Sequence, residues 1–177
     1  MMKWIKWLLI GIAALLLLFA AVGLALPSQF RVERSVVIAA PAEKVYPLIA
    51  SPAEWKRWSA WNRRDPQMQI AYGGPPAGVG ARWSWRSETE GNGEMEFTEA
   101  VPGERLAYRL SFPELGMQST GELRIERDGE GVRVSWSNEG EMGGNPVNRW
   151  FGLFMDRLVG PDFEAGLGNL KRVAEAA

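Results

Sequence analysis

A two-residue alternation of apolar and polar side chains, repeated six times between residues 68 and 136, constrains this chain more than any other feature. Such alternation is typical of strands with one buried and one solvated face. Turns rich in glycine or proline separate the segments, so we expect an antiparallel meander. The apolar positions of the segments are Met68, Ile70 and Tyr72; Trp83 and Trp85; Met95 and Phe97; Leu106, Tyr108 and Leu110; Leu123 and Ile125; and Val132, Val134 and Trp136.

Other elements flank this meander. Residues 30–38 predict a further strand, followed by short helices at about 41–50 and 52–58, with Pro47 bending or interrupting the first. After Asn145 the period becomes helical. The predicted stripe is Val147, Trp150, Phe151, Phe154 and Leu158, continued by Phe163, Leu167, Leu170 and Val173 past a kink or break at Gly160-Pro161. Together these elements predict an α+β helix-grip fold, in which a bent antiparallel sheet of about seven strands surrounds a long C-terminal helix.

An uncharged stretch from Trp7 to Leu26 precedes the predicted domain. Its 20 residues span about 30 Å as a helix, the thickness of a bilayer core. The alternative, a cleaved signal peptide, has a shorter apolar region. We therefore expect a transmembrane anchor at 1–26, a linker at 27–29 and a ligand-binding domain at 30–177. Lys3 and Lys6 favour a single-pass protein with a cytoplasmic N-terminus and an extracytoplasmic domain, held by the linker within about 10 Å of the headgroups.

Composition excludes several kinds of chemistry. The chain has no His and no Cys, which excludes thiolate nucleophiles, Ser-His relays, Cys/His zinc sites and disulfides. The domain carries 18 basic and 21 acidic residues, a balance that argues against nucleic-acid binding. The glycine-rich loop at 72–80 lacks the Lys-Ser/Thr ending of a phosphate-binding loop. We expect neither a metal nor a cofactor.

Aromatic residues of the meander are the candidate ligand-binding site. Alternation places Trp83, Trp85, Phe97, Tyr108 and Trp136 on one sheet face, opposite Phe154, Met155 and Leu158 of the terminal helix. One interpretation is an aromatic pocket of several hundred Å³; the other is a solid core. Three tryptophans are spaced by three, Trp55, Trp58 and Trp61. They guard a pocket mouth, touch lipid headgroups, or, for at least two of them, fix the short helices to the sheet.

Glu99 is the weak candidate for a catalytic residue. It continues the apolar face of Met95 and Phe97, where burial would raise the pKa of a carboxyl group. The alternative is a carboxylate that reaches water or pairs with an arginine.

The segments VERSVVIAAPAEKVYPLI (32–49), WKRWSAWNRRDP (55–66) and NPVNRWFGLFMDRLVGPDFEAGLGNLK (145–171) carry a family resemblance. With them the chain resembles the START-like, or SRPBCC helix-grip, superfamily, also called the polyketide cyclase/dehydrase and lipid transport family, and in particular its membrane-anchored bacterial members. The resemblance implies a cavity between sheet and C-terminal helix that takes apolar ligands. It implies no single reaction, because carriers, cyclases, hydrolases and chaperone activators share the fold.

Three functional hypotheses follow. The first is a membrane-anchored domain that binds a lipid or polyketide-like molecule. The second is a cyclase, dehydratase or hydrolase that uses Glu99 or Tyr108. The third is a non-catalytic accessory protein of an envelope or chaperone system, whose partner the sequence does not name. The absence of His favours binding over catalysis.

Overall fold

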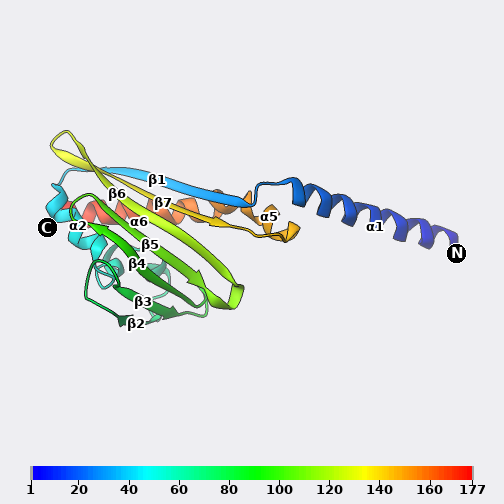
Figure 1. The fold of residues 1–177 in the computed structure, drawn as a ribbon, viewed down its shortest axis with the longest axis horizontal. Coiled ribbons are helices and arrows are strands. Elements are labelled where there is room, and N and C mark those ends of the chain that lie inside the picture. Colours follow the sequence, from blue (N-terminus) through cyan, green and yellow to red (C-terminus); the bar gives the residue numbers. More distant parts are fainter. Residues whose placement is uncertain (1, 177) are drawn as a thin grey trace.

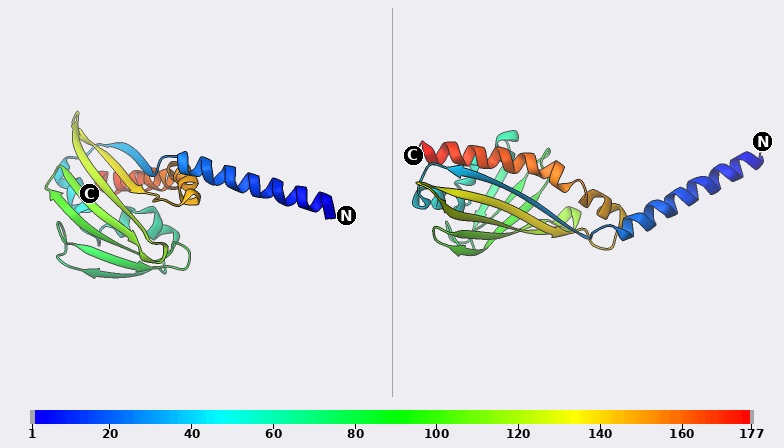
Figure 2. Two further views of the ribbon diagram at one scale, coloured as in Figure 1. Left: turned by 45° about the vertical axis from the view of Figure 1, so that its right-hand side comes forward. Right: turned by 90° about the horizontal axis from the view of Figure 1, so that it is seen from above.

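A computed structural model describes residues 2–176 of the chain (Figure 1). One long helix, α1, projects from a domain in which the C-terminal helix α6 lies along a curved sheet (Figures 1 and 2). The elements in chain order are α1 (Met2–Ala25), β1 (Gln29–Ile38), α2 (Ala42–Ala50), α3 (Trp55–Trp58), α4 (Ala60–Arg64), β2 (Gln69–Gly73), β3 (Arg82–Arg86), β4 (Gly93–Val101), β5 (Arg105–Phe112), the 3-10 turn η1 (Pro113–Leu115), β6 (Met117–Asp128), β7 (Gly131–Glu141), α5 (Pro146–Gly152) and α6 (Met155–Glu175).

The sheet has seven strands in the order β1-β7-β6-β5-β4-β3-β2, and every neighbouring pair is antiparallel. This confirms the predicted meander, with the first strand returning beside the last. The register shifts between Phe97 and Glu99, where β4 carries a bulge against β5. A bulge inserts an extra residue and turns the following side chains relative to the sheet face.

Two prolines were expected to bend or interrupt their helices, and neither interrupts its helix. Pro47 lies inside α2 and Pro161 inside α6, and both helices continue past them. The terminal helical region is instead interrupted between Gly152 and Met155, which separates α5 from α6. Gly160 has a different role from the predicted break: the Arg34 guanidinium lies where a Cβ atom of residue 160 would stand. Its lack of a side chain lets β1 and α6 approach closely.

Aromatic rings fill the interior between α6 and the sheet. The rings of Trp136 and Phe163 stack with centroids 4.0 Å apart, and Trp58 meets Trp136 edge-on at 5.4 Å. Buried polar groups in this region are paired: the Trp136 indole N–H donates to the Tyr108 hydroxyl at 2.9 Å, and Asn169 of α6 donates to the Trp58 carbonyl at 2.9 Å. Bonds of this kind remove the cost of burying polar atoms beside the rings.

Helix α1 is long and apolar enough, from Trp4 to Ala25, to be a membrane span or a signal sequence. Its side chains are exposed along most of its length. The last turns, however, contact α5, which lies between the end of α1 and the start of α6 (Figure 2).

Candidate functional site

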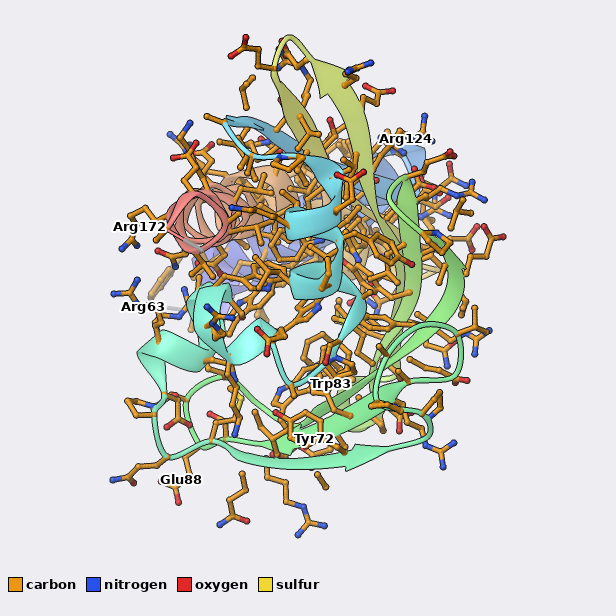
Figure 3. All side chains as sticks on the ribbon, turned by 90° about the vertical axis from the view of Figure 1, so that its left-hand side faces the viewer. Arg63, Tyr72, Trp83, Glu88, Arg124 and Arg172 are labelled. Carbon is orange, nitrogen blue, oxygen red and sulfur yellow. The ribbon has the colours of Figure 1, made fainter. Side chains whose placement is uncertain are left out.

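An apolar cavity of about 90 Å³ lies between the α3–α4 segment and strands β3 to β5. Trp83 projects from β3 into the interior beneath the short helices (Figure 3). The polar groups in the wall are few, and aromatic rings form most of it. The lining residues are Trp55, Ser59, Trp61, Asn62, Met68, Trp83, Trp85, Glu90, Met95, Leu110 and Phe112.

The cavity lies at the end of the sheet that is joined to α1. Strand β1 begins there at Gln29, which is paired with Glu141 at the end of β7. Following the antiparallel register across the sheet, the same end contains the start of β6, the end of β5 at Phe112 and the start of β4 at Gly93. Gly93 is paired with Trp85, so both Trp85 and Phe112 border the cavity at the α1 end.

Polar contacts hold the cover of the cavity in place. Arg64, the last residue of α4, forms ion pairs with Glu90 of the β3–β4 turn at 2.7 Å and with Asp162 of α6 at 2.5 Å. Hydrogen bonding to Glu90 and then to Asp162 raises the pKa of Arg64 above its ordinary value. Next to it, the Ser87 hydroxyl donates to Asp65 at 2.6 Å. The segment after α4 is therefore fixed to both neighbouring elements by charge and hydrogen bonding.

The structure divides the predicted ligand-binding residues into those that line the cavity, those buried beside it, one that is half-buried and two that are exposed. Trp83 and Trp85 line the cavity. Phe97, Tyr108 and Trp136 are fully buried in the aromatic core beside it, and Met155 is half-buried against that core.

The predicted placement of Phe154 and Leu158 opposite the sheet is wrong. Their side chains are 50% and 59% exposed. The cause is the interruption after Gly152, which ends the predicted continuous stripe before α6 begins. Met155 and Val159 pack half-buried against the core, and from Phe163 onward large apolar side chains of α6 are fully buried in it.

Of the two interpretations of the aromatic sheet face, a pocket of several hundred Å³ and a solid core, the space between sheet and terminal helix fits the second. The rings of Trp58, Trp136 and Phe163 occupy that space. The hollow lies to one side, under α4. A wider depression of about 480 Å³ is on the outer face of β2 to β5, where charged side chains such as Arg82, Glu94 and Arg109 surround it.

The candidate catalytic groups are not arranged for catalysis. Glu99 is exposed and pairs with Arg105, which is the alternative that the sequence left open, because the bulge after Phe97 turns it off the apolar face. Burial raises the pKa of Tyr108 to about 12, although hydrogen bonds from Trp136 and Asn138 act in the opposite direction. A buried phenol with this pKa stays protonated at neutral pH and does not serve as a base.

Comparison with known proteins places this architecture in a family. Residues 29–175 match the family model described as "Polyketide cyclase / dehydrase and lipid transport". The chain belongs to this family. The match covers the sheet, the short helices, α5 and α6, and leaves out α1. No curated protein matches the chain.

Solved structures share the fold of this family domain. The di-domain ARO/CYC StfQ from the steffimycin biosynthetic pathway is 14% identical with a TM-score of 0.64, over 84% of this chain and 52% of StfQ. DynU16, from the dynemicin biosynthetic locus, is 16% identical with a TM-score of 0.58, over 82% of this chain and 47% of DynU16. Ara h 8.0201 is 11% identical with a TM-score of 0.57, over 84% of this chain and 99% of its own. The chain thus spans about half the length of StfQ and DynU16.

Sequence reasoning missed the polar lining of the family domain's cavity. Ser59 and Asn62 lie next to Trp58 and Trp61. The three-residue spacing of the tryptophans does not indicate which of the neighbouring residues border a cavity. Glu90 lies in a turn between strands, where no periodicity exists to assign a face. Among residues 2–176, no group of three or more acidic side chains is placed to hold a metal ion.

Proposed function

We propose that this chain is a membrane-anchored domain that binds an apolar molecule, a lipid or a fused-ring polyketide-like compound, in the cavity under α4. The observation that carries the proposal is the cavity itself, because its wall is made of aromatic and aliphatic side chains with few polar groups. Ligand sites are commonly apolar hollows with a small number of placed polar groups. The family membership supports the same class of ligand.

Binding requires the cavity to open. Its volume of about 90 Å³ is well below the roughly 300–1,000 Å³ of sites for drug-sized ligands. The elements over it are the short helices α3 and α4, with four and five residues, and α4 is held at its end by the ion pairs of Arg64. The Arg64 guanidinium is 47% exposed, whereas the side chains of Glu90 and Asp162 are only 14% and 17% exposed. Because these polar contacts hold the end of α4, displacement of α4 and the segment that follows it is the proposed way to admit a ligand.

The few polar groups in the cavity wall could orient one polar end of a mostly apolar ligand. Ser59 and Asn62 offer a hydroxyl and an amide in the wall, while the Glu90 carboxylate is occupied by Arg64. Aromatic rings at Trp83 and Trp85 offer flat surfaces for stacking against a ligand ring or for contact with an acyl chain. With the lining carboxylate paired, this arrangement favours binding over acid–base catalysis.

Anchoring is the second part of the proposal. Helix α1 has the length and apolarity of a bilayer span, and Lys6 near its start favours a cytoplasmic N-terminus with the domain on the other side. We infer that the span stays attached, which would keep the cavity close to membrane-resident ligands.

Native mass spectrometry of the full chain released from phosphatidylcholine nanodiscs tests the binding. The probes are oleic acid and anthracene. Leu110→Trp places a larger ring in the cavity wall, and Leu115→Trp adds the same ring at a position that is 70% exposed. We expect one probe molecule bound to the wild type and to the Leu115 variant, and loss of binding in the Leu110 variant. Equal binding by the two variants would place the ligand elsewhere.

A further inference from the structure

An apolar patch on α5 and the start of α6 faces solvent. Its side chains are between 47% and 59% exposed, although all are large and hydrophobic. We call this surface the α5 patch; its residues are Val147, Phe151, Leu153, Phe154 and Leu158. Contiguous exposed apolar surface on a folded domain commonly marks an interaction site.

Helix α5 is fixed to the last turns of α1 by four kinds of contact. The Trp150 ring stacks on Phe19 with centroids 5.1 Å apart, and its indole N–H donates to the Phe19 carbonyl at 3.1 Å. The Arg149 guanidinium donates to the carbonyl of Leu24 at 2.6 Å, where it also complements the negative end of the α1 dipole. Gly23 has no side chain at the point where Pro146 lies against the helix.

The position of Phe19 sets the depth of α5. Phe19 is six residues before Ala25, the last residue of α1, which corresponds to about 9 Å along the helix axis. If α1 crosses a bilayer, a ring stacked on Phe19 lies below the level at which the span ends. Interfacial amphipathic helices place their apolar faces about 5–10 Å into the headgroup and acyl boundary, so the depth of Trp150 fits that range.

We propose that the α5 patch inserts into the interface of the bilayer that α1 crosses. This inference rests on the anchoring part of the proposed function. The inference goes beyond anchoring by α1, because it assigns α5 as a second element in contact with the membrane and thereby orients the domain. Helix α5 lies at the end of the sheet that is joined to α1 (Figure 1). Trp85 and Phe112 border the cavity at the same end. Insertion of the patch would place the border of the cavity at Trp85 and Phe112 on the membrane side of the domain, so its ligand class is an apolar molecule resident in the membrane.

Fluorescence quenching in lipid vesicles tests the insertion. The natural chain has no cysteine, so each single substitution provides one labelling position. The full chain with Phe151→Cys, labelled with an environment-sensitive dye, is placed in phosphatidylcholine vesicles that contain a phosphatidylcholine carrying a nitroxide near the top of its acyl chain. Val79→Cys, exposed and apolar but in the loop at the opposite end of β3, is the matched control. Leu15→Cys, exposed in the middle of α1, reports the span.

We expect quenching at residues 15 and 151 and none at 79. Quenching at 15 without quenching at 151 would overturn the inserted patch and leave the anchor intact. Loss of quenching at both positions would overturn the anchor and the patch together. The label at 151 could instead be shielded from water but not quenched, and two chains could be cross-linked through it. That result would show that the patch binds a second copy of the chain and would also overturn the proposal.

A pair of glycine variants tests whether the contact with α1 sets the depth. In the Phe151→Cys background, Gly23→Ala places a Cβ atom 2.8 Å from the Pro146 Cβ atom, too close to fit. Gly11→Ala adds the same methyl group in α1 where nothing lies within 4 Å. We expect Gly23→Ala to reduce the quenching at 151 and Gly11→Ala to leave it unchanged. Equal quenching in both variants would show that α5 does not depend on α1 for its depth.

Discussion

Two halves of the interior are both built from aromatic strand residues, but one is filled and the other contains a cavity. Under α6 the sheet residue Trp136 stacks on Phe163 and the space is full. Under α4, the sheet residues Trp83 and Trp85 border a cavity of about 90 Å³. The covering elements explain the difference, because α6 is 21 residues long and packs its buried face along the sheet, whereas α4 has five residues. Aromatic strands make a core where a long helix covers them and a hollow where a short one does.

The filled half is expected to show the largest effect on stability. Trp136→Ala removes a fully buried ring from between Phe163 and Trp58. Burial of this kind predicts a loss of about 3–5 kcal/mol in the free energy of unfolding, measured by chemical denaturation. Trp85→Ala is the matched change in the hollow half and is expected to lose less, because its ring is half-buried and already borders a void. Equal losses would show that the two halves are packed alike.

The Tyr108 hydroxyl is the next test, because it accepts hydrogen bonds from two buried side chains of β7, Trp136 and Asn138. Tyr108→Phe leaves the buried Trp136 indole N–H without its acceptor, with an expected loss of about 1–3 kcal/mol. Tyr72→Phe, at a side chain that is 47% exposed, is the control and should change stability little.

The same residue makes stability depend on alkaline pH. Burial raises the pKa of Tyr108 from 10.0 to about 12, so the folded state keeps the phenolic proton that the unfolded state releases. The stability from this group is fully present below pH 10 and is lost as pH rises through about 12. The free energies of unfolding of wild type and Tyr108→Phe should therefore converge over this range. A constant difference between them would contradict the raised pKa.

The sequence predicted those parts of the fold that depend on periodicity. Alternation gave the strands and which face of each is buried, and Trp83 and Trp85 were assigned to the cavity for this reason. The apolar residues of the terminal stripe were identified correctly, but the sheet was wrongly assigned as the surface that covers all of them. Phe154 and Leu158 face outward, and the helix is interrupted before Met155 and not at Gly160-Pro161. Periodicity predicts which residues share a face and does not identify what covers that face.

The cavity depends on a quantity that no local pattern contains. Its volume is the space under the sheet minus the volume of the side chains that fill it. A small difference in the position of a helix therefore decides whether a pocket or a core results. Trp55 and Trp58 illustrate this: both are buried beside the cavity, yet only Trp55 borders it.

Loosening the cover of the hollow half should change the rate of ligand uptake. Arg64→Ala removes the ion pairs that hold α4 to Glu90 and Asp162. We expect faster uptake of anthracene, measured by stopped-flow tryptophan fluorescence of the full chain in nanodiscs. Arg124→Ala, which removes an exposed ion pair to Glu122 within β6, is the control and should leave the uptake rate unchanged. Equal rates in the two variants would rule out α4 as the moving cover.

The smallest effect is expected at Glu99, on the edge of the filled half. Its carboxylate is 56% exposed and pairs with the half-exposed Arg105, so Glu99→Gln removes one solvated ion pair. We expect the free energy of unfolding to change by less than about 0.5 kcal/mol and the binding of anthracene to stay the same. A large loss of binding or of a measured turnover would return Glu99 to the site and would require β4 to lose its bulge when the ligand is bound, so that residue 99 turns back onto the face of Met95 and Phe97. If Glu99→Gln changes neither stability nor binding, Glu99 belongs only to the solvated face of the sheet. Ligand binding by the sheet then depends on the shape and the aromatic rings of its inner face.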